Sequence, residues 1–420
     1  RALPCVKRFH HSVIDPWQSS LRWNMPSCSW QPTSSCMHRK CRFVLSSTRP
    51  LSWANRLAVP MGISTSTVCS ISWRRLCDPM ANLGEFEFIA QLLQGPAAEG
   101  QPFYRHPLAL GIGDDAALIP PLGPQEQLAV ASDMLIEGRH YLADCDPRSL
   151  GHKVLAVNLS DLAAMGARPL AFTLSAGLRE IRRPWIESFL DGMLSLARES
   201  QCPLVGGDTT AVGAQASEVF SVTVLGVVRV GTALRRDGLQ PGDDLWVSGD
   251  LGDAAFALNQ GIDDSKLNAP QPRLALGLGL VGLASAAIDI SDGLQSELMH
   301  LLNAAQRRAA QPQCLQANVN WQELPLGPLV RQAALAGRLT PSQAAGLAIT
   351  GGDEYELLFA AAPRERARIE ALGPQLGLAL TRIGSVEFSD TPGVRWRDAA
   401  EAQPPESLQD MITRGGFRHF

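Results

Sequence analysis

The sequence PRSLGHKVLAVNLSDLAAMG, residues 147–166, decides the fold because it predicts a long helix that carries an acid among apolar neighbours. Pro147 suits the first turn of a helix, and the large apolar residues that follow recur at helical spacing. These residues are Leu150, Val154, Leu155, Leu159 and Leu162. Asp161 lies between Leu159 and Leu162, so a simple solvent-facing position suits it poorly. We therefore expect a buried helix with a carboxylate of functional interest.

Strands and helices alternate on both sides of this segment. Before residue 235 we predict strands at 128–133, 170–176, 203–205 and 219–230, and helices at 85–94 and 184–199. After residue 242 we predict strands at 244–248, 287–290, 356–361 and 378–384, helices at 252–260, 271–286, 293–306 and 363–372, and then a loop-rich tail. This alternation indicates an α/β (α+β) protein.

The turn-rich sequence RRDGLQPG, residues 235–242, marks a break between two domains. We predict an N-terminal domain at residues 80–236 and a C-terminal α/β domain at residues 237–420. Residues 1–79 hold 11 basic side chains against two acids and show no sustained period. We expect them to be an extraneous or disordered leader, either a start-site artefact or a targeting segment.

Charge and composition exclude several classes of protein. Residues 80–420 hold 26 basic and 39 acidic side chains, a formal charge of −13, which disfavours nucleic-acid binding. No apolar run approaches the roughly 18–20 residues that span a bilayer. Cys145, Cys202 and Cys314 are isolated, as is typical of a reducing compartment. We therefore expect a cytoplasmic protein.

Aspartates recur beside glycines and small apolar residues. They lie in GIGDDAA (111–117), ASD (131–133), NLSDLAAMG (158–166), VGGDTT (205–210), IDISDG (288–293) and GGDEYE (351–356). One such pair is more often a turn or a helix cap, so the inference depends on their number. Two carboxylates about 4 Å apart repel by about 4 kcal/mol at an effective dielectric of about 20, so a shared site needs cations or retained protons.

Oxygen ligands with adjacent glycines suit Mg²⁺ and a polyphosphate, and therefore phosphoryl transfer. Other nucleotide or metal signatures are weak. Gly277, Gly279 and Gly282 form a G-x-G-x-x-G string, but it lies in a helical pattern and indicates helix packing. The sequence contains no P-loop, and its histidines lack zinc spacing. A nucleotide must therefore be held by another architecture.

The ordered strings GEFEFIAQLL, GIGDDAA, SDMLIEGRHY, NLSDLAAMGA, VGGDTT, IDISDGL, TGGDEYELLF and GFRHF resemble the thiamine-monophosphate kinase family from about Gly84 to Phe420. The wider superfamily includes aminoimidazole ribonucleotide synthetase. The resemblance implies a homodimer of two-domain subunits that pair through β-sheet. It implies direct transfer of a phosphoryl group from ATP to thiamine monophosphate.

By resemblance, site residues fall into three groups. Those expected to hold Mg²⁺ are Asp115, Ser132, Asp133, Asp161, Asp208, Asp289 and Asp292. Those expected to contact ATP are Gly207, Arg236 and Ser291. Those expected to contact the thiamine substrate are His140, Asp353 and Phe417, and no covalent nucleophile is expected.

The sequence departs from the family at one loop. The family's usual GGEDYEL reads GGDEYEL here, so Asp353 is one methylene shorter than the expected glutamate and Glu354 follows it. Two alternatives stay open: another ATP-dependent enzyme of the superfamily, such as one similar to aminoimidazole ribonucleotide synthetase, or a nucleotide- and metal-binding regulator without turnover.

Overall fold

The structure is a computed structural model that describes residues 92–308 and 314–415. The predicted leader at 1–79, residues 85–91 of the predicted helix at 85–94, and Phe417 lie outside these residues. In the part of the chain that is described, no helix is long and apolar enough to cross a membrane.

The first half of the described chain forms a four-stranded sheet in the order β1-β4-β2-β3. Its elements are α2 (Gln94–Ala98), η3 (Phe103–Arg105), β1 (Glu126–Ile136), α3 (Pro147–Ala164), β2 (Arg168–Leu178), α4 (Arg183–Glu199), β3 (Leu204–Ala211), β4 (Val219–Arg229) and η4 (Arg236–Gly238). Strand β4 pairs antiparallel with β1 and β2, whereas β2 and β3 are parallel and are joined through α4.

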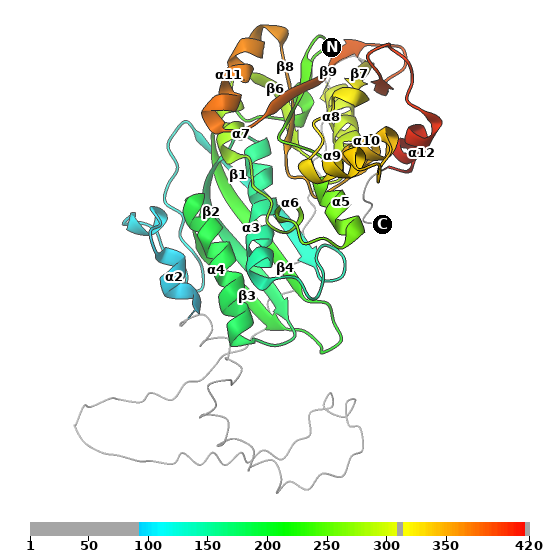
Figure 1. Cartoon of the computed structure of the whole chain (residues 1–420). Coiled ribbons are helices and arrows are strands. Elements are labelled where there is room, and N and C mark those ends of the chain that lie inside the picture. Colours follow the sequence, from blue (N-terminus) through cyan, green and yellow to red (C-terminus); the bar gives the residue numbers. More distant parts are fainter. Residues whose placement is uncertain (1–91, 309–313, 416–420) are drawn as a thin grey trace, which may run out of the picture. The chain divides into compact units, whose positions relative to one another are not determined.

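Helices α3 and α4 lie side by side over one face of this sheet (Figure 1). Two glycines permit the close crossing: a Cβ on Gly151 would lie 1.8 Å from the carbonyl oxygen of Phe189, and one on Gly192 would lie 1.9 Å from that of Arg148. The core between the helices and the sheet is apolar and includes Phe189 and Phe220. Helix α3 is therefore buried nearly all round, as its sequence predicts.

The second half forms a six-stranded mixed sheet in the order β10-β7-β9-β5-β8-β6. Its strands are β5 (Asp244–Ser248), β6 (Ala284–Asp289), β7 (Leu315–Asn320), β8 (Leu357–Ala361), β9 (Leu380–Phe388) and β10 (Gly393–Arg397). Its helices are α5 (Asp253–Gln260), α6 (Ser265–Asn268), α7 (Leu274–Leu280), α8 (Leu294–Arg308), η5 (Trp321–Glu323), α9 (Pro328–Leu335), α10 (Pro341–Thr350), η6 (Pro363–Glu365), α11 (Arg366–Leu376) and α12 (Glu406–Arg414).

Both faces of the six-stranded sheet are covered. Helices α8, α10 and α12 bury one face, and α7 and α11 bury the other (Figure 1). Ala163 and Ala164, at the end of α3, belong to the core that contains α7. Helix α3 thus packs in both halves, and the described residues belong to one compact unit. The division into domains at residues 80–236 and 237–420 stays a prediction.

The predicted helix at 271–286 is wrong in its second half. Helix α7 ends at Leu280, Gly282 has a φ of +79°, and the chain then enters β6. Gly277 and Gly279 do lie in α7, and Gly277 packs closely on α3, so helix packing is confirmed for part of the glycine string, whereas Gly282 lies beyond the helix. The predicted loop-rich tail is also wrong, because it contains β10 and α12.

Candidate active site

One cavity of about 590 Å³ gathers most of the predicted site residues. It is bordered by β1 and the turn after it, α3, η4, α5, the turn between β6 and α8, and the loop before β8. The predicted site residues that line it are Asp133, His140, Asp161, Arg236, Asp289, Ser291, Asp292 and Asp353. They come from both halves of the described chain, so the cavity exists only when the whole unit has folded.

Buried carboxylates give part of this cavity a strong preference for positive charge. Burial, and then the charges of Asp289 and Asp133, raise the pKa of Asp161 to about 8, although Arg236 opposes them. Burial also raises the pKa of Asp289, despite a hydrogen bond of 2.7 Å from Ser160 Oγ to its Oδ2. A bound cation would lower both pKa values because it favours the ionised carboxylates.

The donors fit Mg²⁺ that arrives with phosphate rather than a preformed protein cage. Among the residues described, no group of three or more His, Cys, Asp or Glu side chains is arranged to hold a metal ion. Mg²⁺ typically needs only one or two protein carboxylates and completes its shell with waters and substrate phosphates. The wall of the cavity supplies such carboxylates, those of Asp133, Asp161, Asp289 and Asp292.

Three other predicted residues line a second cavity of about 570 Å³, between the 112–117 segment and β3. They are Asp115, Gly207 and Asp208. Gly207 has a φ of +154°, and a Cβ there would lie 1.8 Å from the carbonyl oxygen of Leu174. Asp208 lies within β3, not in a loop after a strand. The structure therefore divides the predicted acids between two cavities.

Ser132 lines neither of these two cavities. Successive residues of a strand point to opposite faces of a sheet, so Ser132 and Asp133 of β1 cannot both face α3. Asp133 N–H donates to Asn158 Oδ1 of α3 at 2.8 Å, whereas Ser132 Oγ donates to the carbonyl of Val222 in β4 at 2.9 Å. The Ser132 side chain therefore lies outside the cavity that holds Asp133, and its ligand role stays a prediction.

His140 is held by the turn that follows β1. The Ile136 N–H donates to His140 Nδ1 at 3.0 Å, which places the proton of the neutral ring on Nε2. Arg179 Nη2 donates to Glu137 Oε1 at 2.9 Å in the same turn. This hydrogen bond lowers the pKa of Glu137 and keeps it ionised as an anchor.

The loop before β8 has an unusual backbone. Asp353 and Tyr355 have φ values of +61° and +51°, although neither is glycine. Their N–H groups donate to the carbonyls of Ser291 and Ile290, each at 2.8 Å. Such conformations cost roughly 1–2 kcal/mol per residue and persist where surrounding contacts enforce them, often at functional sites.

Lys153 and Tyr355 also line the cavity, although the sequence alone did not single them out. Lys153 Nζ donates to Asp353 Oδ2 at 3.0 Å, and the Tyr355 hydroxyl donates to Asp353 Oδ1 at 3.0 Å. The Lys153 side chain is only 5% exposed. One signal was available: Lys153, Val157 and Asp161 are spaced four residues apart and share a face of α3.

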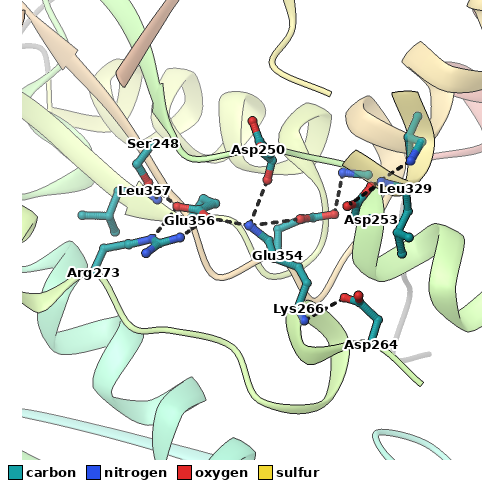
Figure 2. A network of polar contacts seen from close by, with 12 residues as sticks. Ser248, Asp250, Asp253, Asp264, Lys266, Arg273, Leu329, Glu354, Glu356 and Leu357 are labelled. Atoms are coloured by element: carbon teal, nitrogen blue, oxygen red, sulfur yellow. Dashed lines mark hydrogen bonds and ion pairs between the residues drawn. The ribbon is translucent and has the colours of Figure 1, made fainter. Parts of the chain in front are cut away.

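A network of buried charges anchors the far side of the same loop (Figure 2). Arg273 and Lys266 both form ion pairs with Glu356, which also accepts from Ser248 Oγ at 2.6 Å. Glu354 Oε1 accepts from the Gly252 N–H at 2.7 Å. The exchanged acids of the GGDEYEL sequence thus point to different places, Asp353 to Lys153 and Glu354 into this network.

Neighbouring groups give Glu354 and Glu356 opposite pKa shifts. Burial raises the pKa of Glu354 to about 8, and Lys266 opposes it from 3.8 Å. Burial also acts to raise the pKa of Glu356, but Arg273 and Lys266 outweigh it and lower that pKa. The network therefore holds a firm ion pair at Glu356 and a protonated acid at Glu354 near neutral pH.

Comparisons with known proteins agree on one family. The profile of AIR synthase related protein, N-terminal domain, matches residues 113–228. A thiamine-monophosphate kinase of Escherichia coli O157:H7 is 35% identical over 318 residues, which are 72% of this chain and 90% of that protein. The crystal structure of a thiamine-monophosphate kinase from Stenotrophomonas maltophilia K279a is 40% identical and covers 75% of this chain and 97% of its own, with a TM-score of 0.64.

A second similar structure is AaThiL complexed with AMPPCP and TMP. It is 24% identical and covers 72% of this chain and 90% of its own, with a TM-score of 0.57, so it supports the fold. The identity to the Escherichia coli enzyme extends over nine-tenths of that enzyme's length. Because the likeness spans both sheets rather than one motif, the chain belongs to the thiamine-monophosphate kinase family.

Proposed function

We propose that this enzyme transfers the γ-phosphoryl group of ATP directly to thiamine monophosphate, with Mg²⁺ held by aspartates. One observation carries the proposal: a single cavity gathers Asp133, Asp161, Asp289 and Asp292 together with Lys153 and His140. The complex of AaThiL with AMPPCP and TMP supports the choice of ligands. Phosphoryl transfer depends mainly on positioning and charge neutralisation, and this cavity offers both.

The reaction needs no general base from the protein. An oxygen of the thiamine monophosphate phosphate attacks the γ-phosphorus, the bond to the β-phosphate oxygen breaks, and ADP leaves with the electron pair. A phosphate monoester has its second pKa near about 6, so the attacking oxygen carries no proton at pH 7. The task of the residues is therefore to align two anionic groups.

Mg²⁺, when bound, would neutralise the phosphate charges that meet in the cavity. The proposed ligands are Asp133, Asp161, Asp289 and Asp292, which line this cavity, Asp115 and Asp208, which line the second cavity, and Ser132, which lines neither. Gly207, Arg236 and Ser291 are the proposed contacts to ATP, and His140, Asp353 and Phe417 those to the thiamine substrate. Arg236 and Ser291 share the larger cavity with His140 and Asp353, which supports adjacent nucleotide and acceptor sites.

We also propose a homodimer that pairs through the outer face of β1. Leu128, Val130 and Met134 lie on that face and are 43%, 59% and 53% exposed. Strand β1 is the edge of its sheet, with β4 as its neighbour. An apolar edge strand of this kind favours association with a second copy.

The decisive experiment is to measure ADP and thiamine diphosphate formed by the full chain from ATP and Mg²⁺, with and without thiamine monophosphate. We expect both products in equal amounts and only with the acceptor present. ADP and inorganic phosphate without thiamine diphosphate would show transfer to water and contradict thiamine monophosphate as the acceptor. ATP binding without turnover would support the non-catalytic regulator instead.

A further inference from the structure

We propose that Lys153 binds the phosphate group of thiamine monophosphate, and that Asp353 is a positioning residue that aims the Lys153 ammonium. This inference rests on the proposed function and deepens it. It assigns a role to a residue outside every predicted set, and it changes the predicted role of Asp353 from a direct contact to an indirect one.

The Lys153 ammonium has donors to spare. An ammonium has three N–H donors, and within residues 92–308 and 314–415 the hydrogen bond to Asp353 Oδ2 accounts for one. A buried polar group that is not hydrogen-bonded costs free energy, and a buried charge costs more. Because Lys153 borders the cavity, an anionic ligand there would satisfy the two remaining donors.

The oxygens of Asp353 are already engaged. Lys153 donates to Oδ2, and the Tyr355 hydroxyl donates to Oδ1. The backbone at Asp353 is fixed in a left-handed conformation by its hydrogen bond to the carbonyl of Ser291. Asp353 therefore suits the task of orienting Lys153 better than the task of binding a substrate group.

The loop that holds Asp353 is anchored by contacts on both sides without any ligand bound. Glu354 and Glu356, the next acids along the chain, are fixed on the opposite side by Gly252, Ser248, Lys266 and Arg273 (Figure 2). A loop anchored on both sides pre-organises the Lys153–Asp353 pair, which reduces the entropy lost when a ligand binds.

The position of Lys153 favours the acceptor phosphate over the nucleotide. Lys153 and Asp161 lie eight residues apart on one face of α3, so about 12 Å along the helix axis separates them. Asp161 lies with Asp289, Asp133 and Arg236, the proposed metal and ATP end. Lys153 lies further along α3 with Asp353, whereas Tyr355 lies within electrostatic reach of Asp133 and Asp289. Because the ammonium is displaced along α3 from Asp161, we assign it to the acceptor, whose other proposed contact, His140, lines the same cavity.

The test compares two ligands that differ by the phosphate alone. Lys153→Met is measured for binding of thiamine monophosphate and of thiamine by titration calorimetry, and for the KM of each substrate. We expect affinity for thiamine monophosphate to fall roughly 10- to 100-fold, as for loss of a hydrogen bond to a charged group. Affinity for thiamine and the KM for ATP should change less than about twofold.

Two further variants separate positioning from folding. Asp353→Asn should cause a smaller selective loss of affinity for thiamine monophosphate. In this variant Lys153 keeps its charge but loses the carboxylate that orients it. Arg198→Met removes an exposed positive charge at the end of α4 and should leave the ratio of the two affinities unchanged. If Lys153→Met does not fold, Lys153→Met with Asp353→Asn removes both charges and leaves no unpaired acid beside the substituted lysine.

The binding and kinetic results together decide whether Lys153 binds the phosphate of thiamine monophosphate. Equal losses for thiamine and thiamine monophosphate, or no loss for either, would overturn the assignment to the phosphate. A rise in the KM for ATP alone would assign Lys153 to the nucleotide and also overturn it. Failure of the proposed function is distinct, since the unmodified chain would then form no thiamine diphosphate.

Discussion

Glu354 and Glu356 show that single carboxyl groups in this protein take their properties from their immediate neighbours. The two side chains are two residues apart, and both are at most 2% exposed. Glu356 forms ion pairs with Lys266 and Arg273 and accepts a hydrogen bond from the Ser248 hydroxyl. Glu354 Oε2, in contrast, has no hydrogen-bond partner among the described residues. An ionised Glu354 therefore lacks the compensation that a buried charge requires.

Glu354 should make the unliganded protein less stable as the pH rises. Its pKa is raised from 4.5 to about 8, so its stabilising contribution is complete below pH 4.5 and is lost as the pH rises to about 8. In that window the loss is up to about 1.4 kcal/mol per pH unit. Glu354→Gln keeps the neutral form, so its free energy of unfolding should exceed that of the wild type increasingly from pH 5.5 to 7.5.

Urea denaturation at pH 5.5 and at pH 7.5 measures the difference in free energy of unfolding between Glu354→Gln and the wild type. Glu199→Gln, at the exposed end of α4, is the control and should follow the wild type. If Glu354→Gln and the wild type lose stability in parallel, Glu354 is ionised throughout and its burial is compensated by Lys266.

Asp208 provides the residue-scale test of the proposed metal ligands. Asp208→Asn keeps the size of an exposed side chain in β3 and removes its charge. We expect turnover to fall by several orders of magnitude with the melting temperature unchanged. The measurement is the rate of thiamine diphosphate formation at saturating Mg²⁺, with exposed Asp390→Asn as the control. Near-normal turnover would remove Asp208 from the ligand set.

At the scale of elements, α3 is the part on which both halves depend. It packs with α4 on the four-stranded sheet and with α7 beside the six-stranded sheet. Its Asp161 and Lys153 line the cavity, and its Ser160 donates to Asp289 of β6. A shift of α3 would therefore move Asp161, the Lys153 ammonium and the packing of both hydrophobic cores together.

The contact between α3 and α7 can be tested with two glycines of the same helix. A Cβ on Gly277 would lie 2.0 Å from the carbonyl oxygen of Ala163, whereas one on Gly279 would meet Leu372 at an ordinary 3.4 Å. Gly277→Ala should lower the free energy of unfolding by roughly 1–3 kcal/mol through overpacking. Gly279→Ala should raise it by up to about 1 kcal/mol through helix propensity.

Because both variants replace glycine by alanine in the same short helix, the difference between them mainly compares the α3 contact at Gly277 with the looser Leu372 contact at Gly279. Urea denaturation of the two proteins gives that difference. Equal free energies of unfolding for Gly277→Ala and Gly279→Ala would show that α7 can move away from α3 with little loss of stability.

Most elements could be predicted from the sequence, and the errors have physical causes. A short apolar run such as residues 281–286 does not distinguish a buried strand from a helix, and the φ of Gly282 that separates α7 from β6 is not visible in it. Helix α10 was missed although its capping box of Thr340 and Gln343 is legible in the sequence.

The candidate site was predictable where residues carry a local motif. Eight predicted residues do share one cavity, but their separation from Asp115 and Asp208 depends on how the sheet places β3. Lys153 was missed because its partner is 200 residues away, so no local pattern records the pair. Tyr355 was missed because its significance lies in a backbone angle.

At the scale of the whole molecule, the uneven covering of the two sheets predicts association. The six-stranded sheet is buried on both faces, whereas the outer face of β1 exposes large apolar side chains. Natural proteins rarely leave such an edge free, since it invites pairing with another chain.

Val130→Lys should convert the proposed dimer to a monomer, because it places a charge at the centre of the exposed face of β1. Sedimentation velocity at several protein concentrations measures the change. Leu335→Lys, which alters a leucine that is 91% exposed at the end of α9, is the matched control and should leave the mass unchanged. A wild-type chain that stays monomeric at every concentration would rule out the proposed homodimer.

The Lys153–Asp353 pair also has a consequence for synthesis on the ribosome. At about 5–20 residues per second, Lys153 is made roughly 10–40 s before Asp353, which lies 200 residues later. Throughout that interval α3 lacks its ion-pair partner, and until α7 and β6 are made the end of α3 is uncovered as well. The nascent first half therefore carries a central helix, α3, that is only partly buried. A chaperone that binds apolar helices would find its target there, at a time when the enzyme has no substrate site.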